Sequence, residues 1–277
     1  MNAVYEKLKR CLESVRNKTD FIPDVALVLG SGLGGYGERI EVVTTIDYHY
    51  IEGFPVSTVS GHAGRFIFGY VNNVKVVCMQ GRVHYYEGYA MSDVVLPVRL
   101  MGMMGAKVLF LTNAAGGVQL GMKAGDLMMI TDQIACLVPS PLIGANIEEF
   151  GPRFPDMSEI YKKDLQQIVR KSAAKLDIVI KEGTYVQFTG PQYETPHEVA
   201  MARTMGGDAC GMSTACEAVA ANHMGMRILG ISCITNLACG ISPTPLSHEE
   251  VKVAADAAEE KFTALVTEVI TEIGKTL

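Results

Sequence analysis

The sequence lacks the features of several large protein classes. It contains no continuous apolar segment of membrane-spanning length, and the apolar residues near its N-terminus are spaced for a helix rather than for a signal peptide. Its net charge of −6 disfavours nucleic-acid binding, which needs a basic face that releases counterions. Its 7 cysteines include no CxxC pair, which predicts reduced and mostly buried thiols. We therefore expect a cytoplasmic protein with no membrane or nucleic-acid partner.

Several catalytic motifs are missing as well. The chain has no GxxxxGK[ST] phosphate loop, no HExxH metal site and no GxSxG nucleophile elbow, although residues 211–214 approach the last. Its 6 histidines show no spacing that would pair them as metal ligands on a helix, so we expect no metal site. A small anionic ligand is compatible with the net charge, because a few local cations can outweigh it.

A glycine-rich loop stands directly after an apolar, strand-like run. Residues 30–37 follow the run 24–29, and Ser31 lies within the loop. Glycines allow backbone N–H groups to crowd around an anion, and the serine hydroxyl adds a donor. The loop also satisfies the GxGxxG dinucleotide fingerprint, but only about six residues separate Gly35 from the β-branched run 42–46, whereas a crossover with its helix takes at least ~10–12. The spacing therefore favours an anion-binding loop over a nicotinamide-dependent oxidoreductase.

The rest of the sequence is typical of one large α/β domain. The 277 residues are 48% hydrophobic and 19% charged, enough to bury a substantial core. Strands are predicted at residues 25–29, 66–71, 74–80, 108–112, 127–131, 184–188 and 228–234. Asn72-Asn73, between two of these runs, predicts a tight hairpin and therefore a mixed sheet.

Helix signals are clearest in the C-terminal half. S/T-x-x-E capping boxes predict helices that start at Thr195, Thr214 and Ser247. The last helix keeps apolar residues on one face from 251 to 273, which predicts core packing. The segment 139–155, rich in Pro, Gly and Asn, is the longest irregular stretch, and loops of this length often serve a site or an interface.

Polar residues gather where the predicted strands end, which is where open α/β sheets place ligand sites. These residues are Ser31, His62, Arg82, His84, Asn113, Glu194, Ser213, Asn236 and His248. They lie in eight motifs that run in order along nearly the whole chain: GSGLGG, GHAGR, QGRVHYYEGY, TNAAGG, GPQYET, GMST, ITN and SHEEV. On these motifs, the sequence resembles the trimeric, low-molecular-mass purine nucleoside phosphorylases.

The resemblance implies a single-domain, three-layer α/β fold over residues 1–277, with a central mixed sheet flanked by helices, and a homotrimer. It implies reversible phosphorolysis, in which a purine nucleoside and phosphate give a free purine base and a pentose 1-phosphate. Inorganic phosphate is then a co-substrate, and no organic cofactor or metal is implied. The expected substrates are 6-oxopurine nucleosides such as inosine and guanosine, with their 2′-deoxy forms.

The resemblance also implies a phosphate site. Its ligands are expected to be Ser31, Arg82, His84, Ser213 and the backbone N–H of Ala114, with His62 nearby. A planar guanidinium fork suits phosphate oxygens, while hydroxyls and backbone amides complete the cage. By itself, Ser31 would be interpreted as a turn residue, and an isolated arginine as a surface charge. Arg82 and His84 differ from such residues because the apolar run 74–79 ends at them.

Tyr193, Glu194 and Asn236 match the purine-binding residues of these enzymes. Glu194 and Asn236 can contact N1, N7 and the six-position oxygen of the base. Their hydrogen bonds strengthen as the leaving base gains negative charge, so both are expected to be catalytic, together with His84. The residues alone leave a helix-terminal charge open for Glu194 and a turn residue open for Asn236. Tyr193 replaces a frequent phenylalanine, so stacking is retained but its hydroxyl has no assigned role.

The ribose contacts are expected from Tyr86, Met212 and His248, with Phe154 inserted from a neighbouring subunit. His248 would face the 5′-hydroxyl. Related phosphorylases that act on 5′-methylthioadenosine place an apolar residue there and an acidic residue at the position of Asn236. Both positions therefore favour 6-oxopurine nucleosides. A methylthioadenosine phosphorylase and a non-catalytic nucleoside-binding protein are the alternatives.

Overall fold

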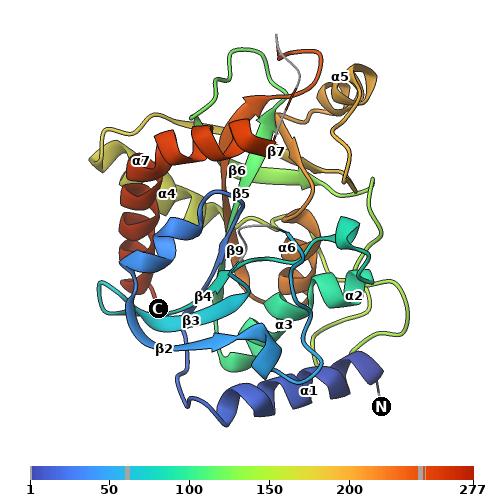
Figure 1. The fold of residues 1–277 in the computed structure, drawn as a ribbon, viewed down its shortest axis with the longest axis vertical. Helices are drawn as coiled ribbons and strands as arrows, with labels where there is room; N and C mark the ends of the chain where they lie inside the picture. The colour runs from blue at the N-terminus through green and yellow to red at the C-terminus, as the bar shows by residue number, and fades with distance from the viewer. Residues whose placement is uncertain (1, 60–62, 243–245, 247) are drawn as a thin grey trace.

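The computed structural model describes residues 2–59, 63–242, 246 and 248–277, apart from the side chains of 248–250 and 252. Its strands are β1 (Val25–Leu29), β2 (Glu41–Asp47), β3 (Arg65–Val71), β4 (Val74–Gln80), β5 (Val108–Gly117), β6 (Leu127–Ile134), β7 (Ile180–Gln187), β8 (Ala209–Gly211) and β9 (Arg227–Leu237). They form one mixed sheet of 9 strands in the order β2-β3-β4-β1-β5-β8-β7-β6-β9 (Figure 1). Strand β9 also pairs with β5, so strands β5 to β9 form a closed circuit at one end of the sheet.

Helices cover both faces of the sheet, which gives the predicted three layers. They are α1 (Ala3–Arg16), α2 (Met91–Val94), α3 (Leu96–Met104), α4 (Lys163–Lys175), α5 (Pro196–Thr204), α6 (Ala215–His223) and α7 (His248–Gly274). One apolar core joins α1, α3 and α6 to the sheet, and a second joins α4 and α7 to its other face (Figure 1). Strand β1 contributes Ala26 and Val28 to the first core and Val25, Leu27 and Leu29 to the second, as the two-residue period of a strand requires. None of the described helices combines the length and apolarity needed to cross a bilayer.

Two predictions for the N-terminal half are confirmed: a tight hairpin, and a glycine loop that no α-helix follows. Asn72 and Asn73 have φ angles of 45° and 68°, the left-handed conformation of a type I′ turn, and they join the antiparallel strands β3 and β4. Between β1 and β2 the chain forms only a 3₁₀ helix of 6 residues, η1 (Gly34–Arg39). Strand β2 then pairs antiparallel with β3. The loop after β1 therefore does not open the α-helix that a dinucleotide fingerprint requires.

Several strand bounds differ from the prediction: β6 continues to Ile134, β7 begins at Ile180 and β9 continues to Leu237. Two further differences bear on the cavity. Strand β5 continues beyond Thr112 to Gly117, although alanine and glycine are poor strand formers. Parallel pairing with β9 holds this extension, since Asn113 pairs with Ser232 and the ladder continues to Gly117. Strand β8 has 3 residues, too few for a hydrophobic period to be recognised. Both segments contribute to the cavity described next.

Candidate active site

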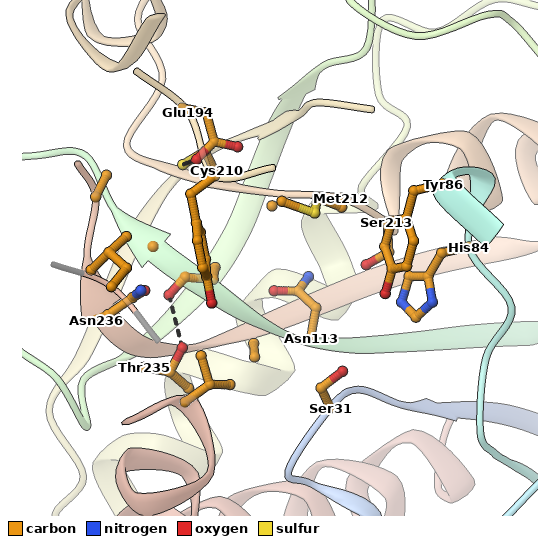
Figure 2. A pocket seen from close by; sticks show the side chains of 18 of the residues that line it. Ser31, His84, Tyr86, Asn113, Glu194, Cys210, Met212, Ser213, Thr235 and Asn236 are labelled. Atoms are coloured by element: carbon orange, nitrogen blue, oxygen red, sulfur yellow. Dashed lines mark hydrogen bonds between the residues drawn. The ribbon is translucent and has the colours of Figure 1, made fainter. Parts of the chain in front are cut away.

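A cavity of about 130 Å³ lies at the C-terminal ends of β1, β4, β5 and β9. The predicted residues that line it are Ser31, Arg82, His84, Tyr86, Ala114, Tyr193, Glu194, Met212, Ser213 and Asn236. Figure 2 shows its labelled side chains in two groups, with Met212 between them. We call one group the serine end (Ser31, Ser213, His84) and the other the carboxylate end (Glu194, Cys210, Asn236). Segments far apart in the sequence thus meet as the motifs predicted.

Three predicted site residues are not among the described residues that line this cavity. His62 lies outside the described residues, and so does the side chain of His248, whose backbone begins α7. Phe154 belongs to the irregular segment between β6 and α4 and is 88% exposed. The guanidinium carbon of Arg153 lies 5.7 Å from the centroid of its ring. The assignment of Phe154 to a neighbouring subunit's site stays a prediction.

Close packing of the β1 loop against β5 positions Ser31. The backbone N–H of Gly30 donates to Thr112 Oγ1 at 3.3 Å. A Cβ on Gly30 would lie 2.5 Å from the Cα of Asn113, so no side chain fits between the two backbones. Gly32, with a φ of 75°, then turns the loop in a conformation that favours glycine. The result is a serine hydroxyl held beside the end of β5.

Arg82 is buried at the serine end, and protein groups hold its guanidinium. Nη2 and Nε donate to the Glu217 carboxylate at 2.8 and 3.2 Å, and Nη1 donates to the Thr112 carbonyl at 2.9 Å. Glu217 also accepts from the Thr214 backbone N–H at 3.0 Å and so caps α6, as the capping box predicted. The sequence analysis assigned the Arg82 guanidinium to phosphate. In the structure this group contacts Glu217, which lies 135 positions away along the chain.

His84 is oriented by Glu87 and Tyr86. Its Nδ1 lies 3.1 Å from Glu87 Oε1, and the Tyr86 ring stacks on it with 4.8 Å between the centroids. Burial acts to raise the pKa of Glu87, but hydrogen bonds from His84 and Thr58 outweigh it and lower the pKa to about 2. Burial lowers the pKa of His84. Near neutral pH, an uncharged His84 therefore donates Nδ1–H to an ionised Glu87, which leaves Nε2 as an acceptor.

Ser213 precedes a strained residue at the start of α6. Thr214 has a φ of 78°, which is rare for a β-branched residue. Its hydroxyl lies 3.1 Å from the Ser213 hydroxyl and accepts from Asn113 Nδ2 at 3.0 Å. Strain of this kind persists only where surrounding contacts hold it, and it is frequent at binding sites. The contacts of Thr214 fix both Ser213 and the Asn113 amide at the serine end.

Glu194 is buried at the carboxylate end. Its Oε2 accepts from the Cys210 thiol, with 3.7 Å between sulfur and oxygen, whereas the buried Oε1 has no hydrogen-bond partner among the described groups. Burial raises the pKa of Glu194. Burial also raises the pKa of Cys210 well above its usual range, so the thiol stays protonated and donates. A buried carboxylate oxygen without a partner is costly, and a ligand N–H would satisfy it.

An irregularity in β9 brings Asn236 to the cavity. The pairing of β5 with β9 skips Thr235, because Ala115 pairs with Ile234 and Gly116 pairs with Asn236. Thr235 Oγ1 lies 3.5 Å from the Ala115 carbonyl oxygen, drawn dashed in Figure 2. Such a bulge re-aims the side chains beside it. Gly116 lies beside this amide, and a Cβ there would make an ordinary van der Waals contact with Asn236 Oδ1, at 3.4 Å.

This geometry suits a ligand with an anionic part and a hydrogen-bonding ring. The serine end offers hydroxyls and the Ala114 backbone, and the carboxylate end offers an acceptor and an amide. Among the described residues, no group of three or more His, Cys, Asp or Glu side chains is placed to hold a metal ion.

Residues 24–271 match the phosphorylase superfamily. The chain is 48% identical to purine nucleoside phosphorylase 1 of Bacillus subtilis, over 96% of this chain and 98% of that protein. It is 41% identical to the purine nucleoside phosphorylase of Rattus norvegicus, over 95% of this chain and 93% of that protein. The chain belongs to the purine nucleoside phosphorylases. A solved structure of the Schistosoma mansoni purine nucleoside phosphorylase in complex with inosine has a TM-score of 0.90 and 36% identity, over 96% of this chain and 95% of that one.

The predictions of family, fold class and enzymatic activity for this purine nucleoside phosphorylase are confirmed. Sequence reasoning missed three residues that contact the predicted site residues or line the cavity: Cys210, Glu217 as the partner of Arg82, and Thr235. Cys210 lies in the short strand β8 and belongs to no recognised catalytic motif. Asn113 was singled out as a polar residue at a strand end, but only the structure connects it to Thr214.

Proposed function

We propose that this purine nucleoside phosphorylase cleaves 6-oxopurine nucleosides such as inosine and guanosine, and their 2′-deoxy forms. The observation that carries the proposal is the buried Glu194 Oε1, which lacks a partner among the described groups and shares its end of the cavity with Asn236. A 6-oxopurine offers an N1–H donor and two acceptors, the six-position oxygen and N7. The carboxylate can accept from N1–H, and the amide can serve the acceptors. A 6-aminopurine has a lone pair at N1 and would face the carboxylate without a donor there.

Structural relatives bind more than one type of base, so the fold alone does not decide the base preference. We assign that preference to Glu194 and Asn236. Solved structures of Schistosoma mansoni purine nucleoside phosphorylase are in complex with inosine and with adenosine. A preference for 6-oxopurines therefore depends on the donors and acceptors of this chain's own residues.

Phosphate is proposed to bind at the serine end. Its donors are the hydroxyls of Ser31 and Ser213 and the Ala114 backbone N–H, with Arg82 as the nearest buried cation and His62 as a further contact. A hydroxyl of the bound phosphate can donate to His84 Nε2 in the orientation that Glu87 imposes. Tyr86, Met212 and His248 are proposed to hold the ribose between the two ends. Tyr193 is proposed to stack on the base.

The proposed reaction forms one bond and breaks one. A phosphate oxygen bonds to C1′ of the sugar while the bond from C1′ to N9 breaks, and the electron pair of that bond stays with the purine. The sugar passes through an oxocarbenium-like state that the phosphate anion stabilises. Glu194 and Asn236 stabilise the negative charge that develops on the base. The departing purine takes up the proton that the phosphate hydroxyl loses, so the products are a free purine and a pentose 1-phosphate, and no step needs an organic cofactor or metal.

Two substitutions test the two ends of the proposed site independently. Asn236→Ala should lower kcat/KM for inosine by roughly 100- to 1,000-fold, the loss of one preorganised hydrogen bond in the transition state. Ser31→Ala should chiefly raise the KM for phosphate and leave the KM for inosine near the wild-type value. Steady-state rates with each substrate varied in turn measure both. Near-normal inosine turnover by Asn236→Ala, or unchanged phosphate dependence in Ser31→Ala, would show that the assigned roles are wrong.

A further inference from the structure

A second cavity, of about 230 Å³, shares no described lining residue with the active-site cavity. Its walls come from the N-terminus of α1, from α2 and α3, from the last residue of α6 and from the irregular segment 141–147. Helices α1, α3 and α6 pack together on one face of the sheet (Figure 1). The purine nucleoside phosphorolysis proposed above uses none of these residues.

Arg99 of α3 lines this cavity as a buried cation, and none of the described carboxylates pairs with it. Its side chain is among the buried charged residues, at 3% exposure, and its Nη1 has no hydrogen-bond partner in the described part of the chain. Burial lowers the pKa of Arg99 to about 10, with no described carboxylate to oppose the shift. The guanidinium carbon lies 4.7 Å from the centroid of Phe150, whose ring also packs edge-on against Tyr5. Burying an unpaired charge is strongly unfavourable, so a position built this way favours an anion as partner.

The surroundings of Arg99 are also suited to negative charge. Asn2 caps α1 beside the cavity, so the positive end of a helix of 14 residues faces it. His223 Nε2 lies 3.1 Å from the Pro152 carbonyl oxygen, to which it donates, and the buried Nδ1 has no partner among the described groups within hydrogen-bond distance. Burial and the Arg99 charge lower the pKa of His223, while hydrogen bonds with the backbone of Gly151 and Pro152 and the exposed Glu148 act to raise it. None of the described residues that line the cavity carries a carboxylate.

We propose that this cavity is a second anion site that binds a dissolved oxyanion of the size of phosphate, with Arg99 as its counter-ion. The guanidinium supplies charge-assisted hydrogen bonds, and Nδ1 of His223 can add a donor when it takes up a proton. A mobile ion fits this position better than a carboxylate of another protein, because the cation is buried and a bulky partner chain would have to reach it through the cavity.

The site would connect an anion to the segment that carries Phe154. Within this segment, Asn146 Nδ2 donates to the Gly151 carbonyl at 3.0 Å, and Arg153 Nη1 donates to the Leu142 carbonyl at 3.0 Å. Leu142 and Asn146 also line the second cavity. An anion bound at Arg99 would therefore hold this segment against α3 and α6, and stabilise the folded protein as any ligand of the native state does.

Inorganic phosphate is the probe for this site. Equilibrium dialysis with radiolabelled phosphate should reveal a site in addition to the active site in the wild-type protein. Arg99→Met should lose this additional site while it keeps the phosphate dependence of inosine cleavage. Arg99→Lys retains the charge without the planar fork and should bind there roughly tenfold more weakly. Circular dichroism checks that each variant is folded, and Arg99→Lys carries the test if Arg99→Met is not.

Two results would overturn the proposal. One is a single phosphate per chain in the wild type, removed by Ser31→Ala and untouched by either Arg99 variant. The other is a single phosphate per chain together with a lower sedimentation coefficient in Arg99→Met, which would assign the guanidinium to a carboxylate of a second copy. The dialysis measurement does not depend on turnover. It therefore tests the second anion site even if the protein does not cleave inosine.

Discussion

In the proposed site, Glu194 accepts a purine N–H most strongly while its carboxylate is ionised, and the neighbouring thiol favours that form. Burial raises the pKa of Glu194, whereas the hydrogen bond from Cys210 opposes the rise. The folded enzyme therefore loses the ionised form at higher pH than an exposed glutamate would, and the thiol moderates this loss. In the proposed reaction, Cys210 would act on the substrate through Glu194, as a positioning residue.

Cys210→Val should move the acidic limb of the pH profile of kcat/KM for inosine to higher pH. Valine removes the donor and keeps the site apolar, so the pKa of Glu194 rises further and activity is lost sooner as the pH falls. Cys210→Ser keeps a donor and should leave the limb close to wild type. Steady-state rates between about pH 5 and 8 measure the shift. A limb that stays in place, or moves to lower pH in the valine variant, would contradict this role.

At the scale of elements, the contact between the β1 loop and β5 builds the serine end. Gly30→Ala should destabilise the protein by about 1–3 kcal/mol, the usual range for overpacking, because its Cβ would meet the backbone of Asn113. It should also raise the KM for phosphate, since the loop carries Ser31. Gly34→Ala is the matched control in the same loop, where the nearest atom to a Cβ is 3.8 Å away in the Gln80 side chain.

Chemical denaturation of both glycine variants, with phosphate kinetics in parallel, checks this contact. Equal stability losses in Gly30→Ala and Gly34→Ala would mean that the loop does not pack on β5 as described.

The elements also show where sequence patterns stop being informative. Periodicity and turn residues predicted β1, β4 and the Asn72-Asn73 hairpin, because local chemistry decides these elements. The extension of β5 and the whole of β8 are decided by pairing with distant strands. The same holds in the site: the donors and acceptors belong to motifs, but the partners of Arg82 and Glu194 are set by tertiary packing.

At the scale of the whole molecule, the proposed role of Phe154 would connect the proposed homotrimer to activity. If its ring completes a neighbouring site, Phe154→Ala should lower kcat/KM for inosine by roughly 10- to 100-fold, through poorer positioning of the ribose. Its exposure in the single chain predicts little change in the free energy of unfolding.

The cytoplasmic location, the trimer and the absence of a cofactor stay predictions.

Mixed assemblies give a sharper test of Phe154. When Phe154→Ala and Glu194→Ala chains are refolded together, some sites combine an intact Glu194 with an intact Phe154 from the other chain. Activity above the sum of the separate variants is the expected result. No recovery in mixtures that sediment as hetero-assemblies would place Phe154 outside the neighbouring site.

The most direct test of the central claim is to incubate the purified protein with inosine, with and without phosphate. Chromatography then quantifies hypoxanthine and ribose 1-phosphate, and 5′-methylthioadenosine is run in parallel. We predict equal amounts of both products from inosine, only when phosphate is present, and no cleavage of 5′-methylthioadenosine. Cleavage of 5′-methylthioadenosine with inosine left intact would contradict the roles of Glu194 and Asn236, and cleavage of neither would indicate a nucleoside-binding protein without turnover.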